Sequence, residues 1–304
     1  MRGRELVEAP FLPAVSRPYT SPVPARQFDA DTAFAALLDR RPGVALVDVL
    51  AEIAVDLDRQ HHTFDLAAWL DEEEEALADL VRPNVAAAAD PVETCVALFE
   101  ALGGRHGLGR RPADYNDYRS SVVRHVVQTG RGLPIVVCIL AAELGRRLGL
   151  DLSGASTPGH FLLRLETDHG YVLVDAYRGG WILQPDEAVE WIAQTTGYPQ
   201  DLIVPALKPT TPRLTIIRVL ENLKRQLVDA QDWPRAYHVQ TRLLALRPGQ
   251  RSDQVDLAAI AAHGPNPNWA LKTLGMLTAD ASQAERKRLL QISRVAKRSL
   301  VGWN

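Results

Sequence analysis

The residues of this chain that could act together in catalysis lie between positions 132 and 180. Residues 132–134 begin a long apolar helix, whose first turn presents unpaired backbone N–H groups and the positive end of the helix dipole. His160 stands at the start of a predicted strand, and Asp175 stands near the end of the next one. A carboxylate that holds an imidazole fixes its tautomer and raises its basicity, as general-base catalysis requires. With a thiol on the helix, these residues would form a Cys-His-Asp arrangement.

The register of the predicted hairpin decides whether His160 and Asp175 can meet. If the turn has two or four residues centred on Asp168-His169, paired positions sum to 337, and His160 lies opposite Tyr177. Asp175 is then a diagonal neighbour of His160 on the same face, within reach of a hydrogen bond. A three-residue turn would place the two on opposite faces. The pair could be a catalytic dyad or a purely structural hydrogen bond.

Two cysteines are present, which are too few for a disulfide framework or a four-thiolate zinc site. Both indicate reduced, intracellular thiols. Cys138 lies one helical turn beyond Pro134, on the same helix face and about 6 Å deeper. It is either a candidate nucleophile or a small buried core residue, because burial raises the pKa of a thiol. We expect Cys95 to be a core residue.

The region before this segment predicts helices from residue 27 to residue 103. Asp65 is expected to cap one helix, and Asp90, followed by proline, to cap another that ends at residues 103–104. The acidic run at residues 71–75 is typical of a solvated helix face. We expect an extended, proline-rich arm over residues 1–26.

The central region, residues 120–213, predicts an α+β domain. A loop over residues 103–119 precedes it, and Ser120-Ser121 could cap a short helix from Val122 to Gln128. A buried helix from Pro134 to Leu148 follows. The alternation of residues 160–177 predicts a hairpin, and residues 181–183 a further short strand. A central helix packed on a small antiparallel sheet is the expected core.

The C-terminal region, residues 214–304, is helical again and contains a repeat. Ala236 and Ala270 are 34 residues apart, and Leu243 and Leu277 keep the same offset. This period matches the tetratricopeptide unit. Because only about two units fit, we expect this region to dock onto the central domain through an apolar face rather than to fold alone.

Composition and charge restrict the function classes. No stretch approaches the ~20 apolar residues of a membrane span, and the N-terminal residues lack the apolar region of a secretory signal, so we expect a cytoplasmic protein. Residues 214–304 carry 14 Lys+Arg against 7 Asp+Glu, a net +7, which leaves −10 for the rest of a chain with net charge −3. The basic stretch 286–298 lacks interleaved aromatics, which favours a solvated face over a nucleic-acid site. His61, His62 and His125 lack metal-ligand spacing, so we expect no metal and no cofactor.

Three further motifs resemble a known family. They are the run from Gly132 to Leu150, the run Pro158-Gly-His-Phe-Leu-Leu-Arg164, and the run Val174-Asp-Ala-Tyr-Arg-Gly-Gly180. Their order and spacing resemble the SirB-type branch of the transglutaminase-like superfamily, over roughly residues 45–280. The resemblance implies a helical N-terminal region, a papain-like α+β core and C-terminal tetratricopeptide-like helices.

The resemblance also implies roles for individual residues. His160 matches the catalytic histidine of the superfamily, and Asp175 matches its catalytic aspartate. The nucleophilic cysteine belongs about fifteen residues before Gly149, where this sequence has Pro134. The sequence therefore predicts a non-enzymatic or cryptic protein that binds another protein through its C-terminal helices. The alternative is a thiol hydrolase or acyltransferase that uses Cys138, His160 and Asp175. A nucleic-acid-associated regulator would depend on the basic C-terminus alone.

Overall fold

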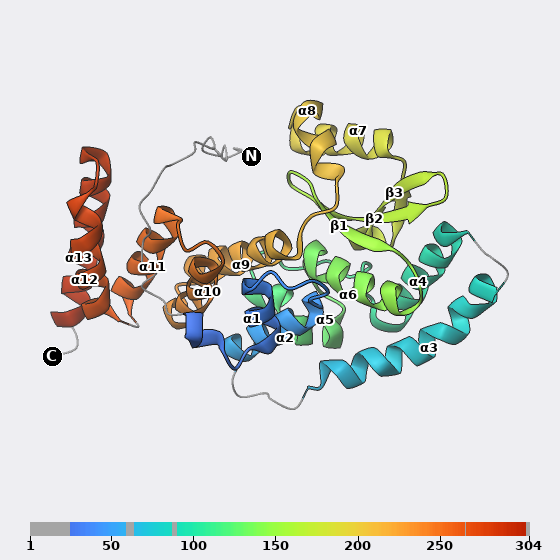
Figure 1. The fold of residues 1–304 in the computed structure, drawn as a ribbon, viewed down its shortest axis with the longest axis horizontal. Coiled ribbons are helices and arrows are strands. Elements are labelled where there is room, and N and C mark those ends of the chain that lie inside the picture. The colour runs from blue at the N-terminus through green and yellow to red at the C-terminus, as the bar shows by residue number, and fades with distance from the viewer. Residues whose placement is uncertain (1–24, 59–63, 87–89, 265, 302–304) are drawn as a thin grey trace.

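A computed structural model of the chain describes residues 25–58, 64–86, 90–264 and 266–301. Most of the expected N-terminal arm, and the pair His61-His62, lie outside these residues. The first described segment is a short 3-10 helix, and four α-helices follow it (Figure 1). These elements are η1 (Ala25–Phe28), α1 (Thr32–Leu38), α2 (Leu46–Leu57), α3 (Leu66–Ala86) and α4 (Pro91–His106).

The caps that begin α3 and α4 are those expected, and the end of α4 is not. Asp65 accepts a hydrogen bond from Ala68 N at 3.1 Å, and Asp90 accepts one from Val92 N at 2.9 Å. The helix α4 was expected to stop at residues 103–104 but continues to His106, because the left-handed residue that ends it is Gly107, at φ +71°.

The acidic run of α3 is solvated as expected at Asp71, Glu72 and Glu75, but not at Glu73. The Glu73 side chain is buried and lies 3.1 Å from Arg105 Nε and 2.8 Å from His106 Nε2, both on α4. Burial alone would raise the pKa of Glu73, but hydrogen bonds from Arg105 and His106 hold it below the usual value. Asp71 and Glu74 accept hydrogen bonds from Arg147. The run therefore attaches α3 to the helices beside it.

The central domain contains two further helices, a four-stranded sheet and a covering layer. The 3-10 helix η2 (Tyr118–Ser121) precedes α5 (Val123–Thr129) and α6 (Pro134–Arg147). The serine pair expected to cap α5 lies instead inside η2, and Val122 is the cap residue, without a side-chain hydrogen bond. The strands are β1 (Leu152–Ser156), β2 (Phe161–Thr167), β3 (Gly170–Asp175) and β4 (Trp181–Leu183), with η3 (Ala176–Arg178) between β3 and β4. The covering layer contains α7 (Pro185–Thr196), α8 (Gln200–Ile203) and η4 (Val204–Leu207).

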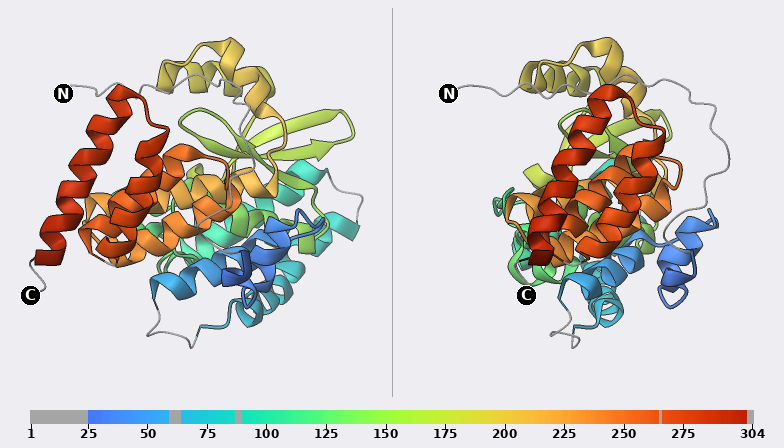
Figure 2. Two further views of the ribbon diagram at one scale, coloured as in Figure 1. Left: turned by 60° about the vertical axis from the view of Figure 1, so that its left-hand side comes forward. Right: turned by 90° about the vertical axis from the view of Figure 1, so that its left-hand side faces the viewer.

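The sheet is antiparallel in the order β1-β2-β3-β4 and is covered on both faces (Figures 1 and 2). Phe161, Leu163 and Leu165 of β2 face α6 and belong to the main hydrophobic core. The alternate residue Leu162 faces α7 and joins a second core with Ile192. This two-fold alternation is the pattern of a strand buried on both faces. The fold is therefore α+β, with a central helix packed on a small antiparallel sheet, as expected.

The hairpin has the register that a two- or four-residue turn centred on Asp168-His169 requires. Leu163 pairs with Val174 and Thr167 with Gly170, so paired positions sum to 337 and the turn has two residues. The ladder between β2 and β3 ends at the pair of Leu163 with Val174, however, and the chain turns into η3 at Ala176. The expected pair of His160 with Tyr177 is therefore not formed.

Five helices form the C-terminal region, and the first of them closes the main core. They are α9 (Pro212–Asp229), α10 (Trp233–Leu246), α11 (Arg251–His263), α12 (Pro267–Ala279) and α13 (Gln283–Val301). One face of α9, with Ile216, Val219 and Leu223, is buried in the same core as α6. The helices α12 and α13 continue the stack away from the central domain (Figure 2).

The α5–α6 segment has one property of membrane segments. No single described helix is long and apolar enough to span a bilayer. By length and composition alone, α5 and α6 together pass the same test as a pair bent by 82°, although the apolar side chains of α6 are buried inside the protein.

Candidate functional site

The N-terminus of α6 has no nucleophile. Pro134 is its first residue, and Leu133 precedes it as the cap without a side-chain hydrogen bond. Leu133 N donates to Ser120 O at 2.8 Å, so η2 is fixed directly beside the helix start. Proline is well placed at the first helical position because that residue needs no N–H donor. The position is thus suited to starting the helix and has no group for attack on a substrate.

The turn that follows Asp175 is packed against the loop that follows α4. Ala113 N donates to Tyr177 Oη at 3.1 Å. Gly109, at φ +71°, approaches so closely that an added Cβ would lie 2.2 Å from Ala176 O. Only glycine fits a position with both a left-handed backbone and this approach. The loop therefore covers η3.

Cys138 is a fully buried thiol on the sheet-facing side of α6. Its Sγ donates to Phe161 O at 3.5 Å. Burial raises the pKa of Cys138 well above its ordinary value, and the negative charge of Asp175 raises it further. The residue also lines a cavity of about 560 Å³ between α6, the sheet and the first turns of α2 and α9. At neutral pH Cys138 is a neutral thiol.

His160 lies immediately before β2 and interacts with α7. Its Nε2 is 3.2 Å from Thr195 Oγ1, and its ring centroid is 4.3 Å from that of Trp191. Burial lowers the pKa of His160, and the positive charges of Arg178 and Arg218 lower it further. The imidazole is therefore neutral at pH 7, as a general base must be, but its nearest polar partner is a hydroxyl.

Asp175 fixes the turn at the end of β3. Its Oδ1 accepts hydrogen bonds from Tyr177 N at 3.0 Å and Arg178 N at 3.3 Å, and its Oδ2 lies 3.7 Å from Arg178 Nε. Burial raises the pKa of this carboxyl, although the two backbone N–H groups and the Arg178 charge act in the opposite direction. The carboxylate is therefore used as the cap of η3.

The three candidate residues are close in the fold but do not form a triad. In the described part of the chain, no hydrogen bond or ion pair joins His160 to Asp175 or to Cys138. The expected hydrogen bond between His160 and Asp175 is therefore wrong in this structure. The hairpin has the register that this hydrogen bond requires. The Asp175 carboxylate, however, accepts from the backbone N–H groups of η3, and the His160 imidazole interacts with Thr195 and Trp191 of α7.

The remaining candidates have structural environments. Cys95 is fully buried in α4, where burial raises its pKa to about 12. Within the described ranges, no group of three or more His, Cys, Asp or Glu side chains could hold a metal ion. Sequence reasoning missed Trp191 and Thr195 as the neighbours of His160, because only tertiary packing brings α7 to this strand.

Comparison with known proteins agrees with the resemblance at the superfamily level. A family model described as the transglutaminase-like superfamily matches residues 69–221, from α3 into α9. A UPF0162 protein of Xylella fastidiosa (strain 9a5c) is 35% identical over 158 residues, which are 50% of this chain and 54% of that protein. A UPF0162 protein of Pseudomonas aeruginosa is 33% identical over 146 residues, which are 48% of this chain and 49% of that protein.

The matched region spans about half the length of these curated relatives. No solved structure gives a significant match. The family model covers half of the chain and includes α6, the hairpin and the strand β4. These are the elements of a central helix on an antiparallel sheet, and the chain belongs to the transglutaminase-like superfamily.

Proposed function

We propose that this chain is a non-enzymatic member of its superfamily that binds another protein through its C-terminal helices. The observation that carries the proposal is the state of Cys138, which is fully buried, bonded to Phe161 O and unconnected to His160. Thiol catalysis needs a thiolate near an imidazole. Here the helix start has Pro134, and burial disfavours the thiolate one turn further on.

The finer assignment to the SirB-type branch, with tetratricopeptide-like helices, is part of this proposal. Asp232 caps α10 by accepting from Arg235 N at 3.2 Å, and Asn266 caps α12 by accepting from Trp269 N at 3.1 Å. The two caps are 34 residues apart, which is the spacing of the alanine and leucine pairs. Equal spacing of caps and core residues supports a repeated helix pair.

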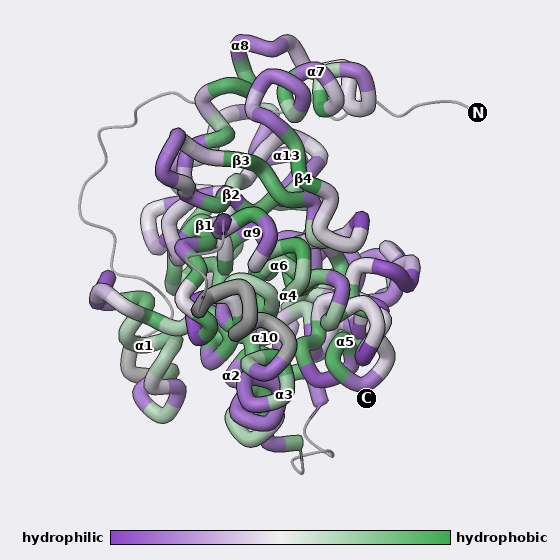
Figure 3. Tube along the Cα trace, turned by 90° about the vertical axis from the view of Figure 1, so that its right-hand side faces the viewer, coloured by the Kyte–Doolittle hydropathy of each residue, from purple (hydrophilic) through white to green (hydrophobic). Residues whose placement is uncertain are grey.

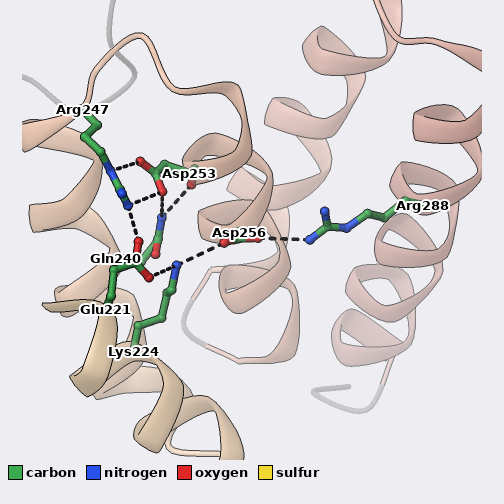
Figure 4. Close-up of polar contacts among 7 residues, drawn as sticks. All are labelled: Glu221, Lys224, Gln240, Arg247, Asp253, Asp256 and Arg288. Atoms are coloured by element: carbon green, nitrogen blue, oxygen red, sulfur yellow. Dashed lines mark hydrogen bonds and ion pairs between the residues drawn. The ribbon is translucent and has the colours of Figure 1, made fainter. Parts of the chain in front are cut away.

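A polar network holds the C-terminal helices in fixed relative positions (Figure 4). Lys224 of α9 pairs with Asp256 of α11 at 3.3 Å, and Arg288 of α13 pairs with the same carboxylate at 3.1 Å. Arg247 binds Asp253 at 2.8 Å and also pairs with Glu221. Successive helices that are fixed in this way can present a rigid surface to a partner.

The outer face of α13 supports a partner with an acidic surface. Its exposed residues include Leu290, which is 56% exposed, and Val301, which is 76% exposed, among six arginines and lysines. Exposed apolar side chains beside basic ones are typical of a protein-binding surface. The localisation in the cytoplasm that the sequence suggested belongs to the same proposal.

Thiol reactivity tests the proposal. Native protein is treated with iodoacetamide near pH 7.5, and modification of Cys138 and of Cys95 is followed separately by peptide mass spectrometry. We expect both thiols to react at least about 100-fold more slowly than in urea-unfolded protein, because reaction requires local opening. The His160→Ala variant should label no more slowly. Rapid labelling of Cys138 that depends on His160 would overturn the proposal.

One observation favours the alternative of a thiol hydrolase or acyltransferase, namely the cavity of about 560 Å³ that Cys138 lines. Such a volume is in the usual range for small-molecule sites. If this alternative holds, a small activated ester should be hydrolysed by the protein, and both Cys138→Ser and His160→Ala should abolish hydrolysis. Hydrolysis that survives Cys138→Ser would exclude it.

A further inference from the structure

The two edges of the sheet differ in what covers them. At the β1 edge, Ala155 forms a bridge with Pro209, and Thr210 N donates to Gly154 O at 2.7 Å. The strand β4 lies at the side of the sheet opposite β1 (Figure 3). It pairs with β3 on one side, and no described residue hydrogen-bonds its backbone on the other. Alternate backbone N–H and C=O groups of an antiparallel edge strand point outward. The β4 edge is therefore open for an added strand.

A groove runs along this open edge. It has a volume of about 390 Å³ and is lined by all three residues of β4 and by four residues of α7, namely Glu187, Glu190, Trp191 and Gln194. Trp181, on β4, is 41% exposed. Exposed tryptophans beside a groove are typical anchor points of protein interfaces. The groove thus combines the unpaired outer edge of β4 with a wall formed by Trp181 and Trp191.

The aromatic wall is held in position from behind. Trp181 and Trp191 make an edge-to-face contact with centroids 5.6 Å apart. The His160 ring lies against Trp191, and the Arg178 guanidinium lies 4.8 Å from the Trp191 centroid and 5.4 Å from that of Trp181. Side chains that are fixed before binding lose less conformational entropy when a ligand arrives. The residue that resembles a catalytic histidine thus supports this wall.

The charge of the groove indicates the chemistry of its occupant. Glu187 accepts from Gln184 N at 2.9 Å, and Glu190 accepts from Gln194 Nε2 at 3.0 Å. Among the described residues, neither carboxylate forms an ion pair with a basic side chain, and the partners of both are an uncharged backbone or amide N–H. Arg178, the cation that already lies against the two indoles, pairs with Asp175 at 3.7 Å. A cation beside an indole face and a carboxylate is attracted by both. A second copy of this edge would bring like charges together, so self-pairing is disfavoured.

From these observations we propose that the open edge of β4 binds an extended peptide segment of a partner protein, with an arginine or lysine side chain in the groove between the indoles and Glu190. The peptide backbone adds a fifth strand, and the basic side chain provides specificity. This surface is separate from the C-terminal helices, and the proposal is independent of whether α13 binds a partner.

Synthetic peptides test the proposal with the full-length protein. The probe is a capped heptapeptide of alternating valine and threonine with a central arginine, and binding is followed by tryptophan fluorescence. A peptide with a central glutamate should bind at least about tenfold more weakly. A peptide that is N-methylated on alternate residues cannot form the ladder and should also lose binding. Hydrogen exchange of residues 181–183 should slow when the arginine peptide is bound.

Two variants locate the site. Glu190→Gln should weaken binding about fivefold, because it removes a charge at the groove. Glu100→Gln, an exposed change on α4, should leave binding unchanged. Trp181→Ala should abolish binding, and Trp181→Phe should retain part of it; Leu202→Ala, at a residue that is 54% exposed, is the matched control. Circular dichroism checks that each variant is folded.

Several outcomes would overturn the proposal. They are equal binding of the arginine and glutamate peptides, full binding of the N-methylated peptide, and no binding of any peptide up to about 5 mM. The proposal would also be overturned if sedimentation shows the protein to be a dimer that the Trp181→Ala substitution dissociates, because the β4 edge would then be a self-association surface. Equal binding by Glu190→Gln and the parent would remove the groove from the site.

Discussion

Replacement of Arg242 by alanine should destabilise the protein more than any surface substitution. Arg242 lies on α10 and is 1% exposed. Its Nε is 2.8 Å from Asp56 Oδ2 on α2, and its Nη2 is 2.7 Å from Asp31 Oδ2 at the start of α1. The guanidinium also lies 4.6 Å from the Phe34 ring centroid. One side chain thus attaches the C-terminal helices to the first two helices.

The size of the expected loss in unfolding free energy follows from the burial of these charged groups. Removal of one partner from a buried ion pair costs about 3–5 kcal/mol, because the other charge stays in a poorly solvated place. The side chains of Asp31 and Asp56 are 29% and 23% exposed, so water can reach them in part and reduces this cost. Loss of the arginine stem and of a cation–π contact adds about 1 kcal/mol. We expect Arg242→Ala to lower the free energy of unfolding by about 3 kcal/mol.

Urea unfolding at 25 °C and pH 7, followed by circular dichroism, measures the change. The control is Arg286→Ala on α13, an exposed position where we expect a change within about 0.5 kcal/mol. A double-mutant cycle with Asp56→Asn should give a coupling of at least about 1 kcal/mol. If Arg242→Ala costs less than about 1 kcal/mol, or if the two changes are additive, the ion pairs do not attach the helices as argued.

Four further predictions concern other parts of the fold. Burial and two nearby arginines lower the pKa of His160 in the folded chain. Below about pH 6.5 the unfolded chain therefore binds a proton at His160 more readily than the folded chain does. The free energy of unfolding should fall as pH drops from about 6.5 toward 5. His160→Gln should make this fall shallower in urea midpoints, and an unchanged slope would contradict it. Gly275→Ala, in a helix with open space around the new Cβ, should stabilise by about 0.5–1 kcal/mol. Gly180→Ala should destabilise by at least about 2 kcal/mol, since φ is +83° and the Cβ would lie 2.4 Å from Phe99; thermal melts of both variants check the opposite signs. A fragment of residues 212–301 should melt without cooperativity, because α9 loses the core that it shares with α6, and a sharp calorimetric transition would refute this.

Local patterns were sufficient to predict α5, α6, the hairpin and β4 of the central domain, but β1, α7 and α8 were not predicted. The spacing of apolar residues predicted the buried helix from Pro134, which the structure has as Pro134–Arg147. The hairpin itself followed from turn chemistry and alternation, whereas its register depended on a turn length that the sequence left open and the structure shows to be two residues. The burial of Cys138 followed from its place one turn inside an apolar helix. These features depend on residues a few positions apart, so a single sequence contains them.

The use of Asp175 could also have been found locally. An aspartate before a short turn that ends in glycine is a signal for a carboxylate that caps backbone N–H groups. Asp175 binds the N–H groups of Tyr177 and Arg178, and Gly179 ends the turn at φ +67°. A catalytic role for Asp175 was expected instead, from the hairpin register and from the family resemblance, and the capping bonds explain why the expected dyad is not formed.

The sequence by itself determined the buried helix α6, the hairpin and which of their faces are apolar, because periodicity and turn chemistry act over short distances. Tertiary structure alone decided the partners of the charged and polar side chains. Glu73 meets Arg105 across 32 positions, His160 meets Thr195 across 35, and Arg242 meets Asp31 across 211. The physical reason is that an apolar side chain is stabilised by burial against any apolar neighbour, whereas a buried charge or imidazole needs a particular partner at a particular distance and angle.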